Sequence, residues 1–354
     1  MKVCVVGAGA IGGLLGARLA LSGQEVTLIA RGPHLRAIQF DGLQVHVSDG
    51  SPVKASNLEA TDDLCELVPQ DLVILGMKAH QIESVVDDLP RLFKPDTMVL
   101  TTQNGIPWWY FQRHGGPLDG RVLNSLDPNG RVSAAIDPAR IIGCIAYPAA
   151  EIVKPGVIRH IEGSRFPVGE LDGTVSERVF SVSEMLIKAG FKSPVLADIR
   201  AEIWLKAWGN LSFNPISALT HATLADICQD PFGRELAETM MTEAQSVAEK
   251  LGINFRVSLQ RRIDGAERVG KHKTSMLQDV EAGKALETEA IIGAVVELGE
   301  LTGIPTPAIR AIYQAVKLLN RTLTEEAVRI LAEPIIEDMP ASVLIKPAAA
   351  AAGR

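Results

Sequence analysis

The chain has 354 residues, 47% of them hydrophobic and 22% charged, with a formal net charge of −7. This length allows two domains, and the hydrophobic content allows a sizeable core. The negative charge and the lack of any lysine or arginine run argue against a nucleic-acid or anionic-membrane partner. The scattered cysteines form no C-x-x-C pair, and the longest apolar run is shorter than the ~20 residues of a membrane span. We therefore expect a cytoplasmic protein with free thiols and no metal site.

The first 31 residues predict a strand, a glycine turn, a helix and a second strand. The two strands are the apolar runs Lys2–Val6 and Glu25–Ala30. Between the first strand and the helix stands the run Gly7-Ala8-Gly9-Ala10-Ile11-Gly12. A G-x-G-x-x-G run in this context is typical of dinucleotide-binding proteins. The alternatives are a purely structural glycine turn and a signal peptide, and the lack of a polar cleavage region argues against the second.

Each glycine of the run has a physical role in holding a dinucleotide. Gly7 allows the tight turn, Gly9 lets a pyrophosphate approach the backbone, and Gly12 lets the helix lie close on the strand. The N-terminus of the helix then faces the phosphates. After the second strand, where NAD-binding sites usually carry Asp or Glu, this chain has Arg31. Because an arginine can pair with a 2′-phosphate that a carboxylate would repel, we predict NADPH as the cofactor; the alternative is that Arg31 is a solvated surface residue.

After Arg31, strand-like and helix-like segments alternate to about residue 196. We expect strands at 43–47, 53–55, 71–77, 97–102, within 140–171 and at 192–196, and helices at 81–92 and 176–189. Lys78 follows one strand and Asn104 follows the next. Because ligands of open α/β sheets bind outside the carboxyl ends of the strands, these residues predict a cofactor cleft together with Gly7 and Arg31.

Residues 106–138 are less regular, and from Asp198 onward helical periodicity dominates. We interpret the group Trp108-Trp109-Tyr110-Phe111 as a buried aromatic helix face rather than a wall of the substrate pocket. Helices are expected at 198–213, 216–228, 231–251, 255–268, 279–302 and 306–320. The predicted fold class is α/β, with a Rossmann-type parallel sheet domain followed by an all-helical domain. We divide the chain into a Rossmann domain at 1–197, an all-helical substrate and catalytic domain at 198–330, and an extension at 331–354 whose end, 346–354, is frayed.

A polar row crosses the first helix of the second domain. Lys206, Asn210 and Asn214 are spaced four residues apart, so they share one face of a helix that is otherwise mostly apolar. They could simply satisfy neighbouring backbone groups, with the lysine reaching water. Beside a dinucleotide cleft, however, the ammonium group could stabilise charge on a carbonyl oxygen and supply its proton. Pro215 is expected to end or kink this helix just after Asn214.

A second polar cluster lies at residues 273–287. Thr274 or Ser275 could simply cap a helix. On one helix starting at Ser275, Glu287 would lie about 18 Å away, so the two side chains would reach opposite ends of a bound pair of ligands.

Taken together, these residues resemble the ketopantoate reductase (2-dehydropantoate 2-reductase) family over about residues 1–325. The resemblance rests on the order and spacing of the glycine run, Arg31, Met77-Lys78-Ala79-His80-Gln81, Gln103-Asn104-Gly105, Lys206 with Asn210 and Asn214-Pro215, and Ser275–Asp279 with Glu287. It implies NADPH-dependent reduction of 2-dehydropantoate, a small 2-oxo acid, to (R)-pantoate in pantothenate biosynthesis.

The resemblance also implies the roles of individual residues. Lys206 is similar to the general acid of the family, and Asn210, Asn214 and Ser275 are similar to its substrate contacts. Asn104 resembles the residue shared between nicotinamide and substrate. The implied cofactor contacts are the glycine run, Arg31 and Lys78 as a pair for the adenosine phosphate, the backbone of Ala149, and Glu287, which contacts the cofactor or the bound substrate region.

The chain departs from the family pattern on the expected substrate side. Ile106-Pro107-Trp108-Trp109 is bulkier than the small residues usual after Asn104, and the stretch up to Gly143 is longer. The alternative function is therefore reduction of another 2-oxo acid or carbonyl compound on the same scaffold. A more remote alternative is an NADPH-binding sensor without turnover. Pairing of two copies into a homodimer is compatible with a helical second domain.

Overall fold

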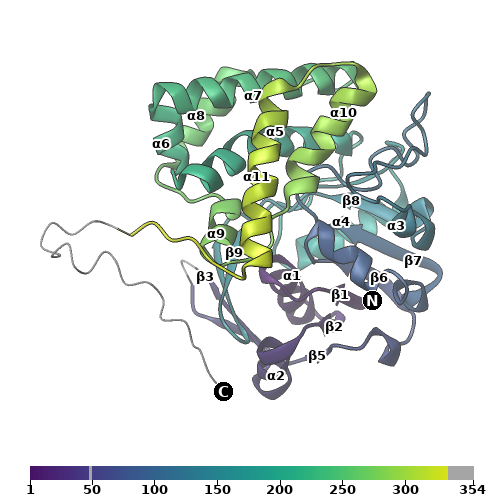
Figure 1. Ribbon diagram of the computed structural model, residues 1–354. Coiled ribbons are helices and arrows are strands. Elements are labelled where there is room, and N and C mark those ends of the chain that lie inside the picture. Colours follow the sequence, from purple (N-terminus) through teal and green to yellow (C-terminus); the bar gives the residue numbers. More distant parts are fainter. Residues whose placement is uncertain (48–49, 334–354) are drawn as a thin grey trace, which may run out of the picture.

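The computed structural model describes residues 1–47 and 50–333 as a sheet-containing half and a helical half (Figure 1). In Figure 1 the helical half lies above the sheets, and α11 (Pro307–Glu325) runs down its front. The predicted frayed tail at 346–354 lies outside the described residues.

The main sheet has seven strands in the order β11-β8-β7-β6-β1-β2-β5. Its strands are β1 (Lys2–Val6), β2 (Glu25–Ile29), β5 (Leu58–Thr61), β6 (Gln70–Leu75), β7 (Phe93–Thr101), β8 (Ile141–Cys144) and β11 (Val168–Glu170). Every pairing is parallel except that of β11 with β8. The central strands are buried along their length, which explains their continuous apolar runs. This arrangement confirms the predicted α/β class.

A second sheet covers α1 (Ala10–Leu21) and explains why that helix is apolar on nearly all sides. Its strands are β3 (Leu43–Val47), β4 (Val53–Ala55), β9 (Ala149–Lys154) and β10 (Val157–Glu162), in the order β4-β3-β10-β9. Glycines let α1 pack closely on both sides. A Cβ at Gly12 would overlap the carbonyl oxygen of Gly7, and one at Gly13 would overlap the side chain of Ile158.

Two short elements of the sheet half differ from the predictions. The helix expected at 81–92 is a pair of 3₁₀ segments, η2 (Ala79–Val85) and η3 (Leu89–Leu92). The strand expected at 192–196 is reduced to isolated bridges, Arg165 with Lys192 and Val168 with Val195. The remaining helices are α2 (Gly32–Asp41), η1 (Leu64–Glu66), α3 (Arg131–Ala135), η4 (Pro138–Arg140) and α4 (Glu177–Lys188).

The aromatic group at 108–111 is buried, as predicted, but it forms turns and no helix. Two of its side chains form hydrogen bonds with neighbouring elements. Trp109 donates its indole N–H to the Thr101 hydroxyl at 2.9 Å, and Tyr110 accepts at its hydroxyl from the indole of Trp204 at 2.7 Å. The segment therefore links the end of β7 to the helical half.

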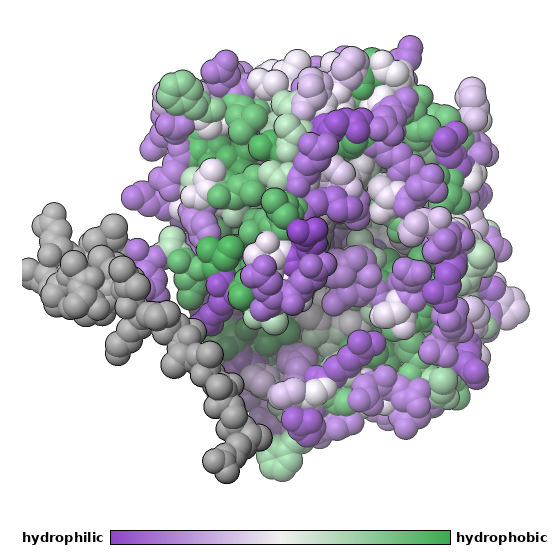
Figure 2. Space-filling model, viewed as in Figure 1, coloured by the Kyte–Doolittle hydropathy of each residue, from purple (hydrophilic) through white to green (hydrophobic). Residues whose placement is uncertain are grey.

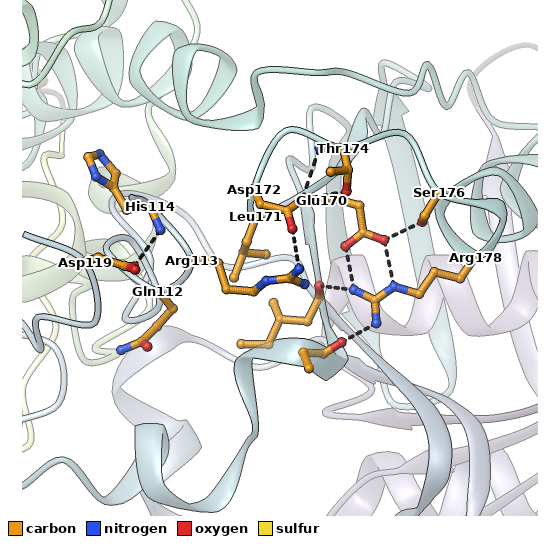
Figure 3. Close-up of polar contacts among 12 residues, drawn as sticks. Gln112, Arg113, His114, Asp119, Glu170, Leu171, Asp172, Thr174, Ser176 and Arg178 are labelled. Carbon is orange, nitrogen blue, oxygen red and sulfur yellow. Dashed lines mark hydrogen bonds and ion pairs between the residues drawn. The ribbon is translucent and has the colours of Figure 1, made fainter. Parts of the chain in front are cut away.

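A buried ion pair attaches α4 to the edge strand β11 (Figure 3). Arg178 donates to both oxygens of Glu170, at 2.7 and 2.5 Å, and the Ser176 hydroxyl donates to the same carboxylate at 2.5 Å. Arg178 also donates to the carbonyls of Ala139 and Ile141. Because Glu170 is only 2% exposed, these bonds replace the water that its carboxylate loses on folding.

The region from 199 onward is helical among the described residues, as predicted. Its elements are α5 (Ile199–Thr220), α6 (Leu224–Gln229), α7 (Pro231–Lys250), α8 (Leu259–Val269), α9 (Ser275–Glu281), the π-helical turn η5 (Glu289–Gly293), α10 (Ala294–Thr302) and α11. The single helix expected at 279–302 is wrong, because the chain leaves the helix after Glu281 and Gly283 adopts φ +63°. No helix in the described part of the chain has the length and hydrophobicity needed to cross a membrane.

Of the two outcomes expected at Pro215, an end or a kink of the polar helix, the end is wrong, because α5 continues to Thr220. A proline inside a helix removes one backbone hydrogen bond, here to the carbonyl of Leu211, and crowds the preceding turn. The residues on either side are buried, including Phe213 and Ile216. Packing on both sides of α5 therefore outweighs the local cost of the proline.

Candidate active site

The glycine run and the second strand of the main sheet form the walls of a cavity of about 220 Å³. Its lining includes Gly7, Ala8, Gly9, Ala30, Arg31 and His34. Gly7 has φ +103°, and a Cβ there would lie 2.8 Å from the backbone nitrogen of Met77. Gly9 caps α1 without a side-chain hydrogen bond, so the first N–H groups of the helix are left for an anion.

Two side chains of this cavity suit a phosphorylated dinucleotide. Arg31 is exposed and forms no ion pair within residues 1–47 and 50–333. His34 accepts from the N–H of Gly156 at Nδ1, at 3.1 Å, so its neutral ring carries the proton at Nε2. That buried Nε2 has no hydrogen-bond partner among the described residues. The open glycine turn, the uncapped helix and this donor fit a bound dinucleotide phosphate.

The structure does not bring Lys78 to Arg31. Lys78 forms an ion pair with Asp279 at 2.6 Å and donates to the carbonyl of Ala285 at 3.0 Å. Both partners belong to the helical half, and Lys78 is not among the residues that line the cavity of Arg31. In this conformation the lysine connects the two halves instead of joining Arg31.

Outside the glycine run, six of the predicted site residues line a second, larger cavity of about 440 Å³ between the two halves. They are Asn104, Ala149, Lys206, Asn210, Asn214 and Ser275. Ile11 of the glycine run also lines it, which places the start of α1 beside both cavities. Asn214 donates to the Ser275 hydroxyl at 3.5 Å and so bridges α5 and α9. Trp108 and Trp109 do not line this cavity; Trp109 shares with Lys206 a separate void of about 10 Å³.

The ammonium group of Lys206 is buried at the wall of the larger cavity. It donates to Asn104 Oδ1 at 2.5 Å and to the carbonyl of Ala146. Burial lowers the pKa of Lys206 from its usual value to about 8, while Glu287 acts in the opposite direction. A lysine with this pKa can hold its proton at neutral pH and still release it readily.

Asn104 connects Lys206 to the buried carboxyl of Glu287. Its Nδ2 lies 3.5 Å from Glu287 Oε2, and the backbone N–H of Ala79 lies 3.4 Å from Oε1. Burial raises the pKa of Glu287, and Lys78 partly offsets that rise. The helix that starts at Ser275 ends at Glu281, so the single-helix spacing expected between Ser275 and Glu287 does not apply, and Glu287 is not among the residues that line the larger cavity.

Sequence reasoning missed a buried carboxylate one turn before Lys206. Glu202 is 1% exposed and accepts from Tyr147 at 2.7 Å, from Arg165, and from Arg256 at 2.5 Å. Tyr147 lines the large cavity, and its ring centre lies 5.9 Å from the Lys206 ammonium. The four-residue spacing of the polar row extends back to Glu202, and that signal could have found it.

The arrangement can perform reduction of a carbonyl group. A proton donor and neutral amide and hydroxyl groups share one cavity, and an anion-binding helix terminus lies next to it. No cluster of three or more His, Cys, Asp or Glu side chains in the described ranges is arranged to hold a metal ion.

Two family models match the chain. One model is described as ketopantoate reductase PanE/ApbA and covers residues 3–108. The other is described as the C-terminal part of ketopantoate reductase PanE/ApbA and covers residues 198–320. A 2-dehydropantoate 2-reductase of Mesorhizobium japonicum is 50% identical over 320 residues, which are 90% of this chain and 98% of the relative.

Solved structures are similar over the same extent. A candidate ketopantoate reductase of Ralstonia solanacearum MolK2 is 38% identical with a TM-score of 0.86, covering 91% of this chain and 98% of that one. A 2-dehydropantoate 2-reductase of Methylococcus capsulatus is 26% identical with a TM-score of 0.77, covering 92% and 98%.

Proposed function

The chain belongs to the ketopantoate reductase family of NAD(P)-dependent oxidoreductases, and we propose that it reduces 2-dehydropantoate to (R)-pantoate with NADPH. The observation that carries this proposal is the buried Lys206 ammonium at the wall of a cavity beside the glycine turn. The 2-dehydropantoate 2-reductase of Mesorhizobium japonicum, which is 50% identical and matched over 98% of its length, supports the choice of substrate.

The proposed cofactor contacts lie along the two cavities. The N–H groups at Gly9 and Ala10 would bind the pyrophosphate, and Arg31 would pair with the 2′-phosphate. When bound, the nicotinamide supplies a hydride. The backbone of Ala149 and the side chain of Asn104 would contact the nicotinamide side, as members of the larger cavity. Lys78 could bind the 2′-phosphate beside Arg31 only if its ion pair with Asp279 were broken, so we assign Lys78 a secondary role in cofactor binding.

We assign two functions to the residues of this chain, namely substrate binding and proton transfer. Asn210, Asn214 and Ser275 hold the substrate through neutral hydrogen-bonding groups that line the cavity. Lys206 donates its proton to the substrate oxygen as negative charge develops there. Asn104 and Glu287 keep the ammonium in place, the first through its amide oxygen and the second through charge.

The test of this function is NADPH oxidation by the purified protein with ketopantoate, beside a panel of other 2-oxo acids. We expect ketopantoate to have the highest kcat/KM. Faster turnover of another 2-oxo acid would move the function to that substrate on the same scaffold. NADPH binding without turnover of any member of the panel would favour the sensor alternative.

A substitution at Arg31 tests the cofactor assignment. We expect Arg31→Ala to lower kcat/KM for NADPH about 10- to 100-fold, because charge-assisted hydrogen bonds contribute about 1.5–3 kcal/mol, and to leave NADH unchanged. The measurement is steady-state kinetics with both cofactors. Arg36→Ala, an exposed arginine of α2 outside the cavity, is the matched control. An equal loss with NADPH and NADH would contradict a role in phosphate recognition.

We extend the proposal to the organisation of the molecule. The Rossmann domain comprises residues 1–197 and the catalytic domain 198–330, since α5 begins at Ile199.

We propose a cytoplasmic protein and pairing of two copies. Figure 2 shows hydrophobic residues gathered over the helical half on this face, which is a feature of interaction surfaces. Light scattering of the purified protein tests the pairing.

A further inference from the structure

Arg262 of α8 extends to the substrate cavity from outside the polar row of α5. Its side chain lines the cavity together with Lys206, Asn210 and Asn214. The guanidinium lies against the backbone of Gly209, where an added Cβ would come 2.8 Å from Arg262 Cζ and overlap Nη2. The missing side chain at Gly209 is therefore what gives the guanidinium room on the surface of α5.

Among the residues that the structure describes, the guanidinium of Arg262 has no partner of opposite charge. Within residues 1–47 and 50–333 its side chain makes no hydrogen bond or ion pair, and its buried Nε lacks any acceptor. Burial lowers its pKa. A partly buried cation without a carboxylate or carbonyl acceptor is costly, and folded proteins normally satisfy such groups. Arg165 and Arg178, by contrast, each pair with a buried glutamate.

The position of Arg262 matches the shape of a 2-oxo acid. Gly209 follows Lys206 by three residues, a rise of about 4.5 Å along the helix. A 2-oxo acid carries its carboxylate on the carbon next to the carbonyl, so Lys206 and Arg262, the lysine and the arginine that line the cavity, can reach adjacent parts of one small molecule. Asn210, Asn214 and Ser275 are neutral, and none of them can balance the carboxylate charge.

We propose that Arg262 binds the substrate carboxylate and that the glycine at position 209 keeps its guanidinium free to do so. The inference rests on the proposed function and deepens it, because it makes the site selective for 2-oxo acids over uncharged ketones. Arg262 holds the carboxylate of the substrate, and Lys206 protonates the oxygen of the adjacent carbonyl group.

The experiment compares an acid with its uncharged ester in Arg262→Met, which keeps an unbranched hydrophobic stem and removes the guanidinium with its charge. We expect KM for ketopantoate to rise about 10- to 100-fold, from loss of a charge-assisted pair of about 1.5–3 kcal/mol. We expect the KM for its methyl ester and the Kd for NADPH to stay within about twofold of the wild type. A purely structural role would change all three. An unchanged KM for the acid, or an equal loss with the ester, would overturn the proposal.

A second variant displaces the guanidinium and leaves its charge in the chain. We expect Gly209→Ala to raise KM for the acid as Arg262→Met does, because the new methyl group occupies the place of the guanidinium. Gly265→Ala is the matched control. It also replaces a helical glycine, and in the described part of the chain only the Nη2 of Arg268, 4.0 Å away, lies near the position of its Cβ. Equal effects of the two alanine substitutions would contradict the inference.

A binding measurement separates failure of this inference from failure of the proposed function. Calorimetry with oxamate and NADPH-loaded protein reports the carboxylate site without turnover. If the wild type reduces no 2-oxo acid but binds oxamate, and Arg262→Met does not, the carboxylate site stands and the proposed reaction fails. If the wild type reduces ketopantoate while Arg262→Met binds oxamate equally well, the reaction stands and the carboxylate site fails. Neither reduction nor binding by the wild type would overturn both.

Discussion

Replacing Lys206 with methionine is expected to lower kcat/KM for the 2-oxo acid by about 10³- to 10⁴-fold, from loss of the proton donor and of the charge at the substrate oxygen. The change keeps the length and hydrophobic stem of the side chain, so α5 should retain its packing. Steady-state kinetics measures the loss, and NADPH fluorescence checks that the cofactor still binds. Lys188→Met, at an exposed lysine in the last turn of α4, is the control. Retention of more than a tenth of wild-type activity would remove Lys206 from the mechanism.

The pH profile gives a second, independent readout of the same residue. Burial lowers the pKa of Lys206 to about 8, so the ammonium form predominates below that pH and the neutral amine above it. Reduction requires the protonated form, and wild-type kcat should therefore fall as pH rises through about 8. The residual activity of Lys206→Met should lack this alkaline decline. If the variant keeps the same decline, another group is the acid.

Gly105→Ala is expected to destabilise the protein by about 3–5 kcal/mol, since a backbone clash in the core adds to an unfavourable dihedral angle. Gly105 has φ +80°, and a Cβ there would overlap the Ala290 carbonyl and lie 2.9 Å from the nitrogen of Ile291. The next residue, Ile106, donates its N–H to the same carbonyl at 2.8 Å. The substitution should therefore separate the end of β7 from η5. Urea unfolding at equilibrium measures the change.

Gly116→Ala separates the effect of the dihedral angle from the effect of the backbone clash, two effects that are combined in Gly105→Ala. Gly116 has a similar φ of +75°, is exposed, and has nothing within 4 Å of its Cβ position. Its substitution should lower the free energy of unfolding only by the cost of placing alanine in the left-handed conformation, about 1–2 kcal/mol. If Gly105→Ala is no more destabilising than Gly116→Ala, the contact with Ala290 does not hold the two halves together. Because Asn104 precedes Gly105, a folded fraction of the Gly105 variant should also lose activity.

The electrostatics of the site depend on groups that are far apart in the sequence. The ammonium of Lys206 lies near the carboxyl of Glu287, which Asn104 connects to it. Burial opposes the charged form of both groups, lowering the pKa of the lysine and raising that of the glutamate. Each of the two groups is therefore less readily charged than the same side chain would be in water. Lys206, Arg262 and the exposed Glu162 line the cavity that a substrate carboxylate would enter, so its lining keeps a net positive charge.

The sequence alone predicted the central strands of the main sheet and the main members of the candidate site. The apolar runs of β1 and β6 and the glycine run before α1 are local patterns, and the carboxyl ends of parallel strands meet at one edge of a sheet. The row Lys206, Asn210 and Asn214 follows from helical periodicity. Those rules act over a few residues, so they can be applied before the fold is known. The roles of these residues stay predictions for the experiments above.

Only the tertiary structure decided which distant groups meet. It gave Lys78 the partner Asp279, 201 residues away, and it carried α5 through Pro215 because both sides of that helix are buried. It also brought Arg262 to the backbone of Gly209, a contact for which the spacing along the chain holds no signal. Such pairings depend on how whole helices pack against one another. In that packing, burial outweighs local helix propensity, and the absence of one side chain leaves room for another.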